Sequence, residues 1–184
     1  DDILVSAISN NDSIQIFVIS DRQLPTSGSL VINSMTHDGT IISSIHKRIH
    51  VGKDSSKKLS IDKTDLLKDY DESDVIIHTS FDCDNNNYDN ISFLVPQKNV
   101  KFVEPKITVD ITGEAGDYTV TVNSDSFVRA FYMSLDDSDD YFFDDNYFDI
   151  LPGKKHSVSL KTSLPLEAIR SSLSWTSLYN ATHR

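Results

Sequence analysis

Short runs in which apolar and polar residues alternate dominate the chain, and turn residues separate one run from the next. Alternation with a period of two is typical of strands that bury one face. In the first half the runs are SIQIFVIS (13–20), SLVINSMT (29–36), TIISSIHKRIHV (40–51), KKLSI (57–61), VIIHTSFD (75–82) and NISFLVP (90–96). HDG (37–39), between the second and third runs, is a strong hairpin signal. The first half is therefore predicted to be an antiparallel β-sandwich.

Two segments of this half give more detailed expectations. The run 40–51 is predicted to place Ile41, Ile45, Ile49 and Val51 on one face and Ser44, His46, Arg48 and His50 on the other. His46 and His50 then stand about 13 Å apart along the strand, which is too far for one metal ion. DKTDLLKDY (62–70) is predicted to hold a turn or two of helix, with Asp62 as its N-cap.

QKNVKFVEPK (97–106) breaks this rhythm, and two prolines, Pro96 and Pro105, bracket the break. We place a domain boundary there, which gives predicted domains at 1–103 and 104–184. Beyond it the runs resume at 106–111, 117–124, 126–135, 146–150, 155–162 and 173–180, with a candidate short strand near 141–143 and a hint of helix at 166–172. This pattern is typical of an immunoglobulin-like sandwich. The predicted fold class is all-β, with two tandem antiparallel β-sandwiches of the immunoglobulin-like kind.

Composition and charge exclude some classes of binding partner. Of the 184 residues, 38% are hydrophobic, and no apolar run approaches the roughly 20 residues that span a bilayer, so no membrane partner is expected. The formal charge is −11 without a basic cluster, which argues against nucleic acid. The charge does not exclude neutral ligands such as sugars, or other proteins, as partners. The single cysteine, Cys83, excludes an internal disulfide and leaves the compartment open. The chain opens on DDILVSAI, without a signal-peptide pattern. Because it begins almost on a strand, we expect a piece of a longer protein.

The stretch DDSDDYFFDDNYFD (136–149) carries seven aspartates threaded by aromatic residues. Clustered carboxylates repel one another, and a cation such as calcium would relieve that repulsion. The candidate metal ligands are Asp136, Asp137, Asp139 and Asp140. Aromatic rings bind the apolar faces of sugars, and the candidate ligand-binding residues are Tyr141, Phe142, Phe143 and Trp175. The third interpretation is a solvated acidic loop followed by a strand, whose core positions are expected among Tyr147, Phe148 and Ile150.

A second acidic stretch, D-C-D-N-N-N-Y-D-N-I-S-F (82–93), opens like a calcium loop, with Asp82, Asp84 and Asn86 at alternate positions. It then departs from that pattern, because Asn87 stands where the loop needs glycine and Phe93 where it needs a bidentate glutamate. We interpret this stretch as a hairpin tip whose asparagines tolerate left-handed backbone.

No catalytic residue is assigned from the sequence. The four glutamates, which are Glu72, Glu104, Glu114 and Glu167, are scattered through turns and the linker. The sequence holds no G-x-S-x-G nucleophile elbow, no phosphate-binding loop and no dinucleotide fingerprint. The residues alone therefore predict a pair of β-sandwich modules without a visible active site.

Three stretches resemble the C-terminal domains of β-mannosidases of glycoside hydrolase family 2. VISDRQLPTSGSLVINSMTHDGTII (18–42) resembles the sandwich domain that follows the catalytic barrel. NISFLVPQKNVKFVEPKITVDI (90–111) resembles the last strand of that domain, the linker and the first strand of the terminal immunoglobulin-like domain. DDNYFDILPGKKHSVSL (144–160) is similar to the D-N-Y-F-D-L-L-P-G-E segment of the terminal domain, with Ile150 for the first leucine and Lys154 for the glutamate.

The resemblance implies an exo-acting enzyme that removes terminal β-linked mannose with retention, by two glutamates about 5–5.5 Å apart on a barrel upstream of this chain. None of the four glutamates lies in a matching motif, so the domains are expected to be non-catalytic and to pack on that barrel. The implied partners are the barrel of the same polypeptide and, through the parent enzyme, a mannose-containing glycan. No cofactor is expected apart from the candidate calcium. A bacterial enzyme of this kind is periplasmic or cytoplasmic. The alternatives are a carbohydrate-binding module and a calcium-dependent cell-surface module.

Overall fold

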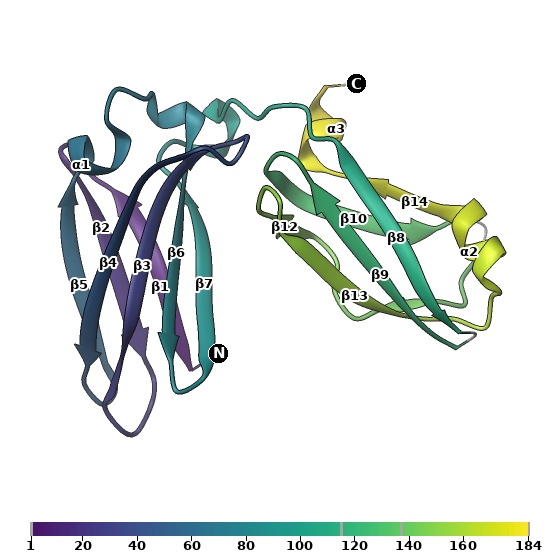
Figure 1. Cartoon of the computed structure of the whole chain (residues 1–184), viewed down its shortest axis with the longest axis horizontal. Coiled ribbons are helices and arrows are strands. Elements are labelled where there is room, and N and C mark those ends of the chain that lie inside the picture. Colours follow the sequence, from purple (N-terminus) through teal and green to yellow (C-terminus); the bar gives the residue numbers. More distant parts are fainter. Residues whose placement is uncertain (1, 115, 137, 184) are drawn as a thin grey trace. The chain divides into compact units, whose positions relative to one another are not determined.

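The computed structural model describes residues 2–114, 116–136 and 138–183, and it confirms the all-β prediction (Figure 1). The chain divides into two compact units, the first ending at Lys101 and the second beginning at Phe102. The boundary predicted from the sequence, after residue 103, lies two residues beyond this division. Across the described residues, no helix has both the length and the apolar character needed to cross a membrane.

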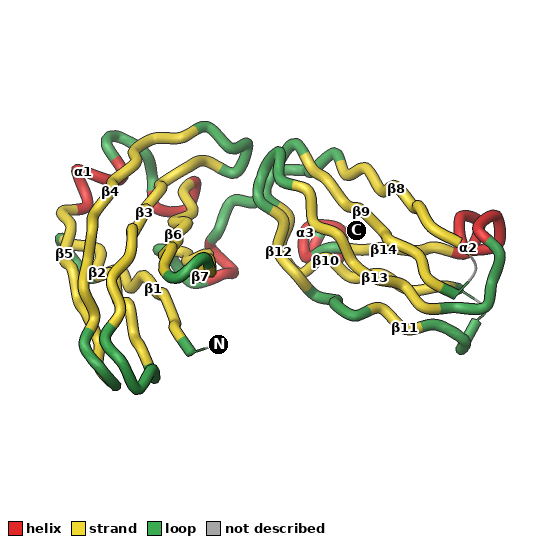
Figure 2. Tube along the Cα trace, turned by 60° about the horizontal axis from the view of Figure 1, so that its bottom comes forward, coloured by secondary structure: helices red, strands yellow, loops and turns green. Residues whose placement is uncertain are grey.

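Unit 1 consists of two antiparallel sheets (Figure 2). The smaller sheet has three strands in the order β1-β2-β5, which are Ile3–Ser9, Ser13–Ser20 and Ser55–Asp62. The larger sheet has four strands in the order β4-β3-β6-β7, which are Ile41–Val51, Thr26–Thr36, Val75–Cys83 and Asn86–Phe93. The six predicted runs correspond to β2 through β7, with shifted ends, and β1 is a further strand that was not predicted.

The core of unit 1 follows from the alternation along its strands. Ile14, Ile16 and Val18 of β2 are buried at every second position, and they share one apolar cluster with Leu30 and Ile32 of β3. Burying a side chain of this size stabilises the fold by about 1.5–3 kcal/mol. The apolar residues whose period of two predicted these strands are thus the residues that fill the space between the sheets.

One prediction for β4 is wrong, because a β-bulge changes which residues face the core. The pairing of β3 with β4 shifts between Ser34 and Met35, so that Ile42 is an extra residue on β4. An extra residue reverses the alternation beyond it. Ile41 is accordingly 50% exposed, whereas Ile42 and Ile45 pack against the core.

The helical segments of unit 1 are short. The predicted helix is present as α1 (Lys63–Leu67), and Asp62 occupies its N-cap position without making a side-chain capping hydrogen bond. Burial of Leu66 and Leu67 fixes this turn against the sandwich. Two further turns are 3₁₀ helices, η1 (Glu72–Asp74) and η2 (Gln97–Asn99).

Unit 2 also has a four-stranded and a three-stranded antiparallel sheet. The larger sheet has the order β11-β13-β9-β8, which are Phe142–Phe143, Lys155–Lys161, Asp117–Ser124 and Ile107–Glu114. The smaller sheet has the order β12-β10-β14, which are Phe148–Ile150, Val128–Leu135 and Leu173–Thr176. The predicted helix at 166–172 is α2 (Leu166–Ser172).

The predicted strand 173–180 is only half correct, since β14 ends at Thr176 and α3 (Leu178–Thr182) follows. Ser177 is the N-cap of α3, and its hydroxyl accepts a hydrogen bond from the backbone nitrogen of Asn180 at 3.4 Å. A serine in this position satisfies an otherwise unpaired donor of the first helical turn. The local capping signal therefore prevails over the apolar alternation that favoured a longer strand.

The core of unit 2 contains two residues of the strand predicted at 146–150. Phe148 and Ile150 are 9% and 1% exposed, and they belong to one cluster with Phe131 and Met133 of β10. The expectation that this segment contributes core positions is confirmed for these two residues. Tyr147, in contrast, is 68% exposed.

Candidate functional site

The four candidate ligand-binding aromatics do not form a single surface. Phe142 and Phe143 are consecutive in β11, and Phe142 is 62% exposed while Phe143 is buried. Tyr141 packs edge-on against Phe143, with ring centroids 5.5 Å apart. Trp175 lies on β14 in the other sheet, where its ring packs on Phe131 at 5.6 Å. The structure therefore brings Tyr141 and Phe143 together and leaves Phe142 and Trp175 on separate sheets.

Two of the candidate metal ligands in the acidic loop, Asp136 and Asp140, have different hydrogen-bond partners. Asp136 accepts from the Ser174 hydroxyl, and Asp140 accepts from the hydroxyl and the backbone nitrogen of Ser163, the latter at 3.3 Å. These bonds from Ser163 lower the pKa of Asp140. Asp137 lies outside the described residues. Within 2–114, 116–136 and 138–183, no three acidic, histidine or cysteine side chains are grouped as a metal site. Calcium binding here stays a prediction.

The second acidic stretch forms the hairpin tip that was predicted. Asp84 and Asn85 connect β6 to β7, with φ of 49° and 62°, which matches a two-residue turn whose central residues both need positive φ. The carboxylate of Asp82 accepts from the Asn87 side chain at 2.6 Å, and that of Asp84 is paired with Arg22 at 2.5 Å. The asparagine-rich sequence is thus explained by backbone geometry and local hydrogen bonds.

Arg22, in the connection from β2 to β3, is the centre of a polar cluster at one end of unit 1. Its guanidinium donates to Asp2 at 2.7 Å, to Asp84 at 2.5 Å and to the Tyr88 hydroxyl at 2.9 Å. Hydrogen bonds from Tyr88 and Arg22 hold the pKa of Asp2 below its ordinary value, and the Asp2 carboxylate raises the pKa of Arg22. Because Asp2 precedes β1 and Asp84 follows β6, this cluster joins the two sheets.

Arg22→Ala is expected to lower the melting temperature of unit 1 by a few degrees, because three partners lose their shared donor at once. Lys101→Ala is the matched control, since Lys101 is 61% exposed and pairs only with exposed carboxylates, where ion pairs contribute little. Thermal unfolding followed by circular dichroism measures both variants. Equal melting temperatures for the two would show that the Arg22 cluster contributes no more than a surface pair.

His37, in the turn after β3, is a buried titratable residue outside any predicted site. It is 3% exposed, and its Nε2 lies 3.4 Å from the carbonyl oxygen of Ser73. Burial lowers the pKa of His37 below its ordinary value of 6.5, more than the nearby carbonyl and carboxylates raise it. The imidazole is therefore held neutral in the folded unit.

This lowered pKa predicts a pH dependence of stability. The unfolded chain binds a proton near pH 6.5 and the folded chain does so only at lower pH, so the free energy of unfolding falls as pH drops through 6.5. His37→Gln removes the titration. Urea unfolding at about pH 7 and about pH 5 should show a smaller loss of stability in the variant than in the natural chain. An identical loss in both would contradict the assignment to His37.

Side chains as well as backbone join β12 to β10, an arrangement that the sequence analysis missed. The Asn146 amide accepts from the backbone nitrogen of Met133 at 2.8 Å and donates to its carbonyl at 2.9 Å, as a paired strand residue would. At a bulge, Arg129 and Ala130 lie opposite Asp149 alone. The Asp149 carboxylate accepts from the Ala130 nitrogen at 3.0 Å and forms an ion pair with Arg129. Side-chain mimicry of backbone pairing leaves no periodic signal in a sequence.

Between these anchors, Tyr147 has left-handed backbone, with φ of 64°. Phe148 points into the core and packs on Phe131 with ring centroids 5.5 Å apart. The Tyr147 ring lies instead against Tyr132, at 4.8 Å between centroids and an interplanar angle of 34°. The result is a pair of tyrosine rings of which one is largely exposed.

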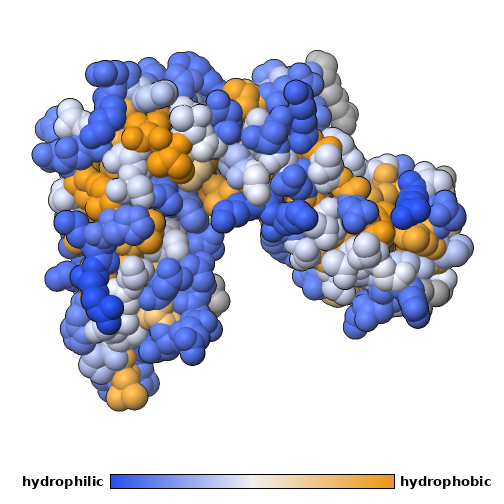
Figure 3. Space-filling model, viewed as in Figure 1, coloured by the Kyte–Doolittle hydropathy of each residue, from blue (hydrophilic) through white to orange (hydrophobic). Residues whose placement is uncertain are grey.

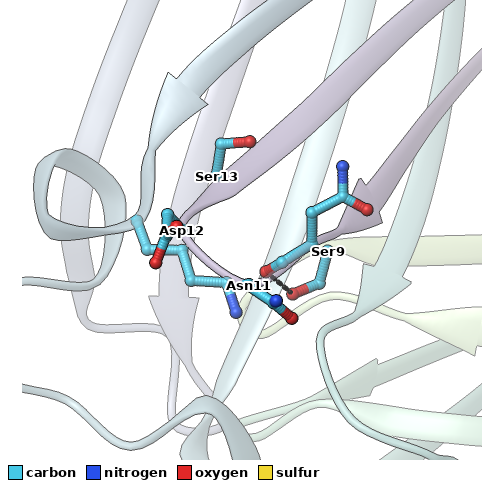
Figure 4. Close-up of a pocket in the computed structure, with 6 residues that line it drawn as sticks. Ser9, Asn11, Asp12 and Ser13 are labelled. Carbon is cyan, nitrogen blue, oxygen red and sulfur yellow. Dashed lines mark hydrogen bonds between the residues drawn. The ribbon is translucent and has the colours of Figure 1, made fainter.

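Two of the hollows on unit 1 differ in character. The one in Figure 4 lies at the turn between β1 and β2, has a volume of about 750 Å³ and is lined by Ser9, Asn10, Asn11, Asp12, Ser13 and Lys63. It is polar, and its lysine is engaged by Glu72 at 2.6 Å. The other, of about 320 Å³, runs between the edge strands β4 and β5 and includes Ile45, Leu59 and Ile61 in its lining. Figure 3 shows hydrophobic side chains gathering on this side of unit 1.

Comparison with known proteins finds two family matches in tandem. Residues 12–99 match the Mannosidase Ig/CBM-like domain, and residues 102–181 match the Ig-fold domain of mannosidases. Among curated proteins no sequence matches this chain. The crystal structure of the β-D-mannosidase from Dictyoglomus thermophilum is similar over 96% of this chain and 22% of its own, with a TM-score of 0.74 and 19% identity. Red sea bream transglutaminase is similar over 89% of this chain and 27% of its own, with a TM-score of 0.41 and 11% identity.

Proposed function

The chain belongs to the mannosidase immunoglobulin-like domain families, and from that premise we propose that it is a non-catalytic part of a β-mannosidase and supports the catalytic domain of that enzyme. The observation that carries the proposal is the order of the two family matches, one over each unit. The chain spans 22% of the length of the similar β-D-mannosidase, which leaves ample length for a separate catalytic domain.

In this proposal the hydrolysis of terminal β-D-mannose, exo-acting and with retention, takes place outside this chain. A retaining glycosidase needs two carboxyl groups about 5–5.5 Å apart. Glu72 of unit 1 is paired with Lys63 at 2.6 Å, and Glu167 of unit 2 is paired with Arg170 at 3.2 Å. These glutamates lie in different units and are engaged in local ion pairs, which is consistent with a structural role.

The groove between β4 and β5 is the proposed contact with the catalytic domain of the same polypeptide. Ile45, Leu59 and Ile61 pack against the core of unit 1 and are still only partly buried. Covering apolar surface of this kind contributes about 25 cal/mol per Å² removed from water. The two sheet edges that flank the groove would be covered at the same time, which protects them from pairing with other chains.

Hydrolysis of a chromogenic β-mannoside tests the proposal. The 184-residue chain alone is expected to release no product, whereas the polypeptide from which it comes is expected to hydrolyse the substrate. Replacing Glu72 and Glu167 by glutamine in the longer polypeptide should leave its turnover unchanged. Turnover by the isolated chain, or loss of turnover in those variants, would overturn the assignment of chemistry to another domain.

A further inference from the structure

Tyr147 is an exposed aromatic residue in a backbone conformation that aromatic residues rarely adopt. Its φ is 64° and its side chain is 68% exposed. A left-handed conformation crowds the Cβ of an L-residue, so glycine or asparagine would adopt it with less strain. Strained residues of this kind gather at ligand-binding positions, where the surrounding structure holds them in place. Stability of unit 2 thus does not require tyrosine here, so the reason for this residue lies in the surroundings of its ring.

Those surroundings fix the position of the ring. The Asn146 side chain is bonded to both backbone groups of Met133, and Phe148 is anchored in the core. Asp149 is bonded to the backbone of the bulge in β10. Tyr147 therefore lies between anchored residues on both sides, and its ring packs against that of Tyr132. A binding group held in place before the ligand arrives loses little conformational entropy on binding.

Tyr147 and Tyr132 share strands β12 and β10 and their flanks with an ion pair that suits a polyhydroxylated, uncharged ligand. Arg129 and Asp149, which form an ion pair and are both partly exposed, lie at the bulge, where Asp149 is two residues along the chain from Tyr147. A guanidinium donates and a carboxylate accepts hydrogen bonds, so together they match the two capacities of a sugar hydroxyl. The net charge of the chain is −11, which weakens the binding of an anionic ligand and has no effect on that of a neutral one.

We propose that Tyr147 and Tyr132, with the Arg129–Asp149 pair beside them, bind one pyranose ring of a neutral glycan. The ring stacks on the exposed face of Tyr147, and its hydroxyls bond to the ion pair. This site differs from the predicted group of Tyr141, Phe142, Phe143 and Trp175. It is also independent of the proposed supporting function.

The size of the surface favours a sugar over a protein partner. Among the described residues of unit 2, the large hydrophobic side chains that are exposed are Val103, Phe142, Tyr147 and Trp175. Of these, Tyr147 alone adjoins β12, and its ring partner Tyr132 lies on β10. The apolar surface therefore has the size of a stacked ring pair, whereas a stable protein interface covers about 800 Å² on each partner.

NMR titration of the whole chain with β-1,4-linked mannotriose tests the proposal. The expected result is saturable shifts at residues 129–132 and 146–149, with a millimolar dissociation constant. Tyr147→Ala is expected to weaken binding by about tenfold or more. Tyr147→Asn relieves the backbone strain, so it should keep or raise the melting temperature of unit 2 and still lose binding.

Phe142→Ala is the matched control, because Phe142 is a similarly exposed ring on the other sheet. Its affinity for mannotriose is expected to be unchanged. The proposal is overturned if no residue of the chain responds to the sugar, or if shifts centre on 141–143 and Trp175 and disappear with Phe142→Ala. It is also overturned if the same tyrosines shift with protein concentration in the absence of sugar, since that result identifies a protein interface.

Discussion

Phe148→Ala is expected to destabilise unit 2 by about 3–5 kcal/mol, the usual cost of removing a buried aromatic side chain. The Phe148 ring fills the space between Phe131 and His156, with centroids at 5.5 and 3.9 Å. Its loss leaves a cavity under the three-stranded sheet, in which β12 and β14 are short. Trp175, the single tryptophan, packs on Phe131, so its fluorescence reports the unfolding of unit 2.

Tyr147→Ala is the control for this prediction, because the neighbouring residue is of similar size and exposed. We expect the urea midpoint followed by Trp175 fluorescence to shift strongly for Phe148→Ala and little for Tyr147→Ala. Similar shifts for the two variants would contradict the placement of Phe148 in the core and of Tyr147 outside it.

Gly28→Ala is the second substitution with a large expected effect. A Cβ at Gly28 would lie within 2.6 Å of the Phe81 ring and closer still to the carbonyl oxygen of Asp82. Phe81 is fully buried, and the Asp82 carbonyl belongs to the backbone of β6, which pairs with β3. Neither can move without separating two central strands, so we expect a loss of about 1–3 kcal/mol or more, as for other overpacked cores.

Gly52→Ala is the matched control, since the nearest atom to its Cβ would be the Ser55 hydroxyl at 3.0 Å, a side chain that can rotate away. Circular dichroism should show a lower melting temperature for unit 1 in Gly28→Ala than in Gly52→Ala. The Trp175 transition of unit 2 is expected to stay unchanged in both. A Gly28→Ala variant as stable as the natural chain would show that β3 and β6 are not packed as described.

The fold was largely predictable because, in a sandwich, buried and exposed residues alternate along each strand. Ile14, Ile16 and Val18 illustrate this, since each is both a position in a period of two and a core residue. Prediction failed where one local event interrupts that period. Ile42 is an extra residue in a β-bulge and turns Ile41 outward, and Ser177 caps a helix where alternation favoured strand.

The candidate site was less predictable, because exposure of an aromatic ring depends on backbone detail. Phe142 and Phe143 are consecutive residues of the same type, yet only Phe142 is exposed. The sequence predicted core positions among Tyr147, Phe148 and Ile150 without saying which, and Tyr147 is the exposed one. Its left-handed backbone departs from strand geometry. That conformation depends on side-chain bonds from Asn146 to Met133, a contact that sequence alternation does not encode.

The supporting role is tested most directly by removing residues 1–184 from the polypeptide to which they belong. The remaining polypeptide, which would carry the catalytic domain, is expected to melt at a lower temperature than the intact one. Its melting temperature should rise again when the separate 184-residue chain is added. The account is contradicted if the remaining polypeptide has the melting temperature and kcat/KM of the intact protein, and if adding the chain changes neither.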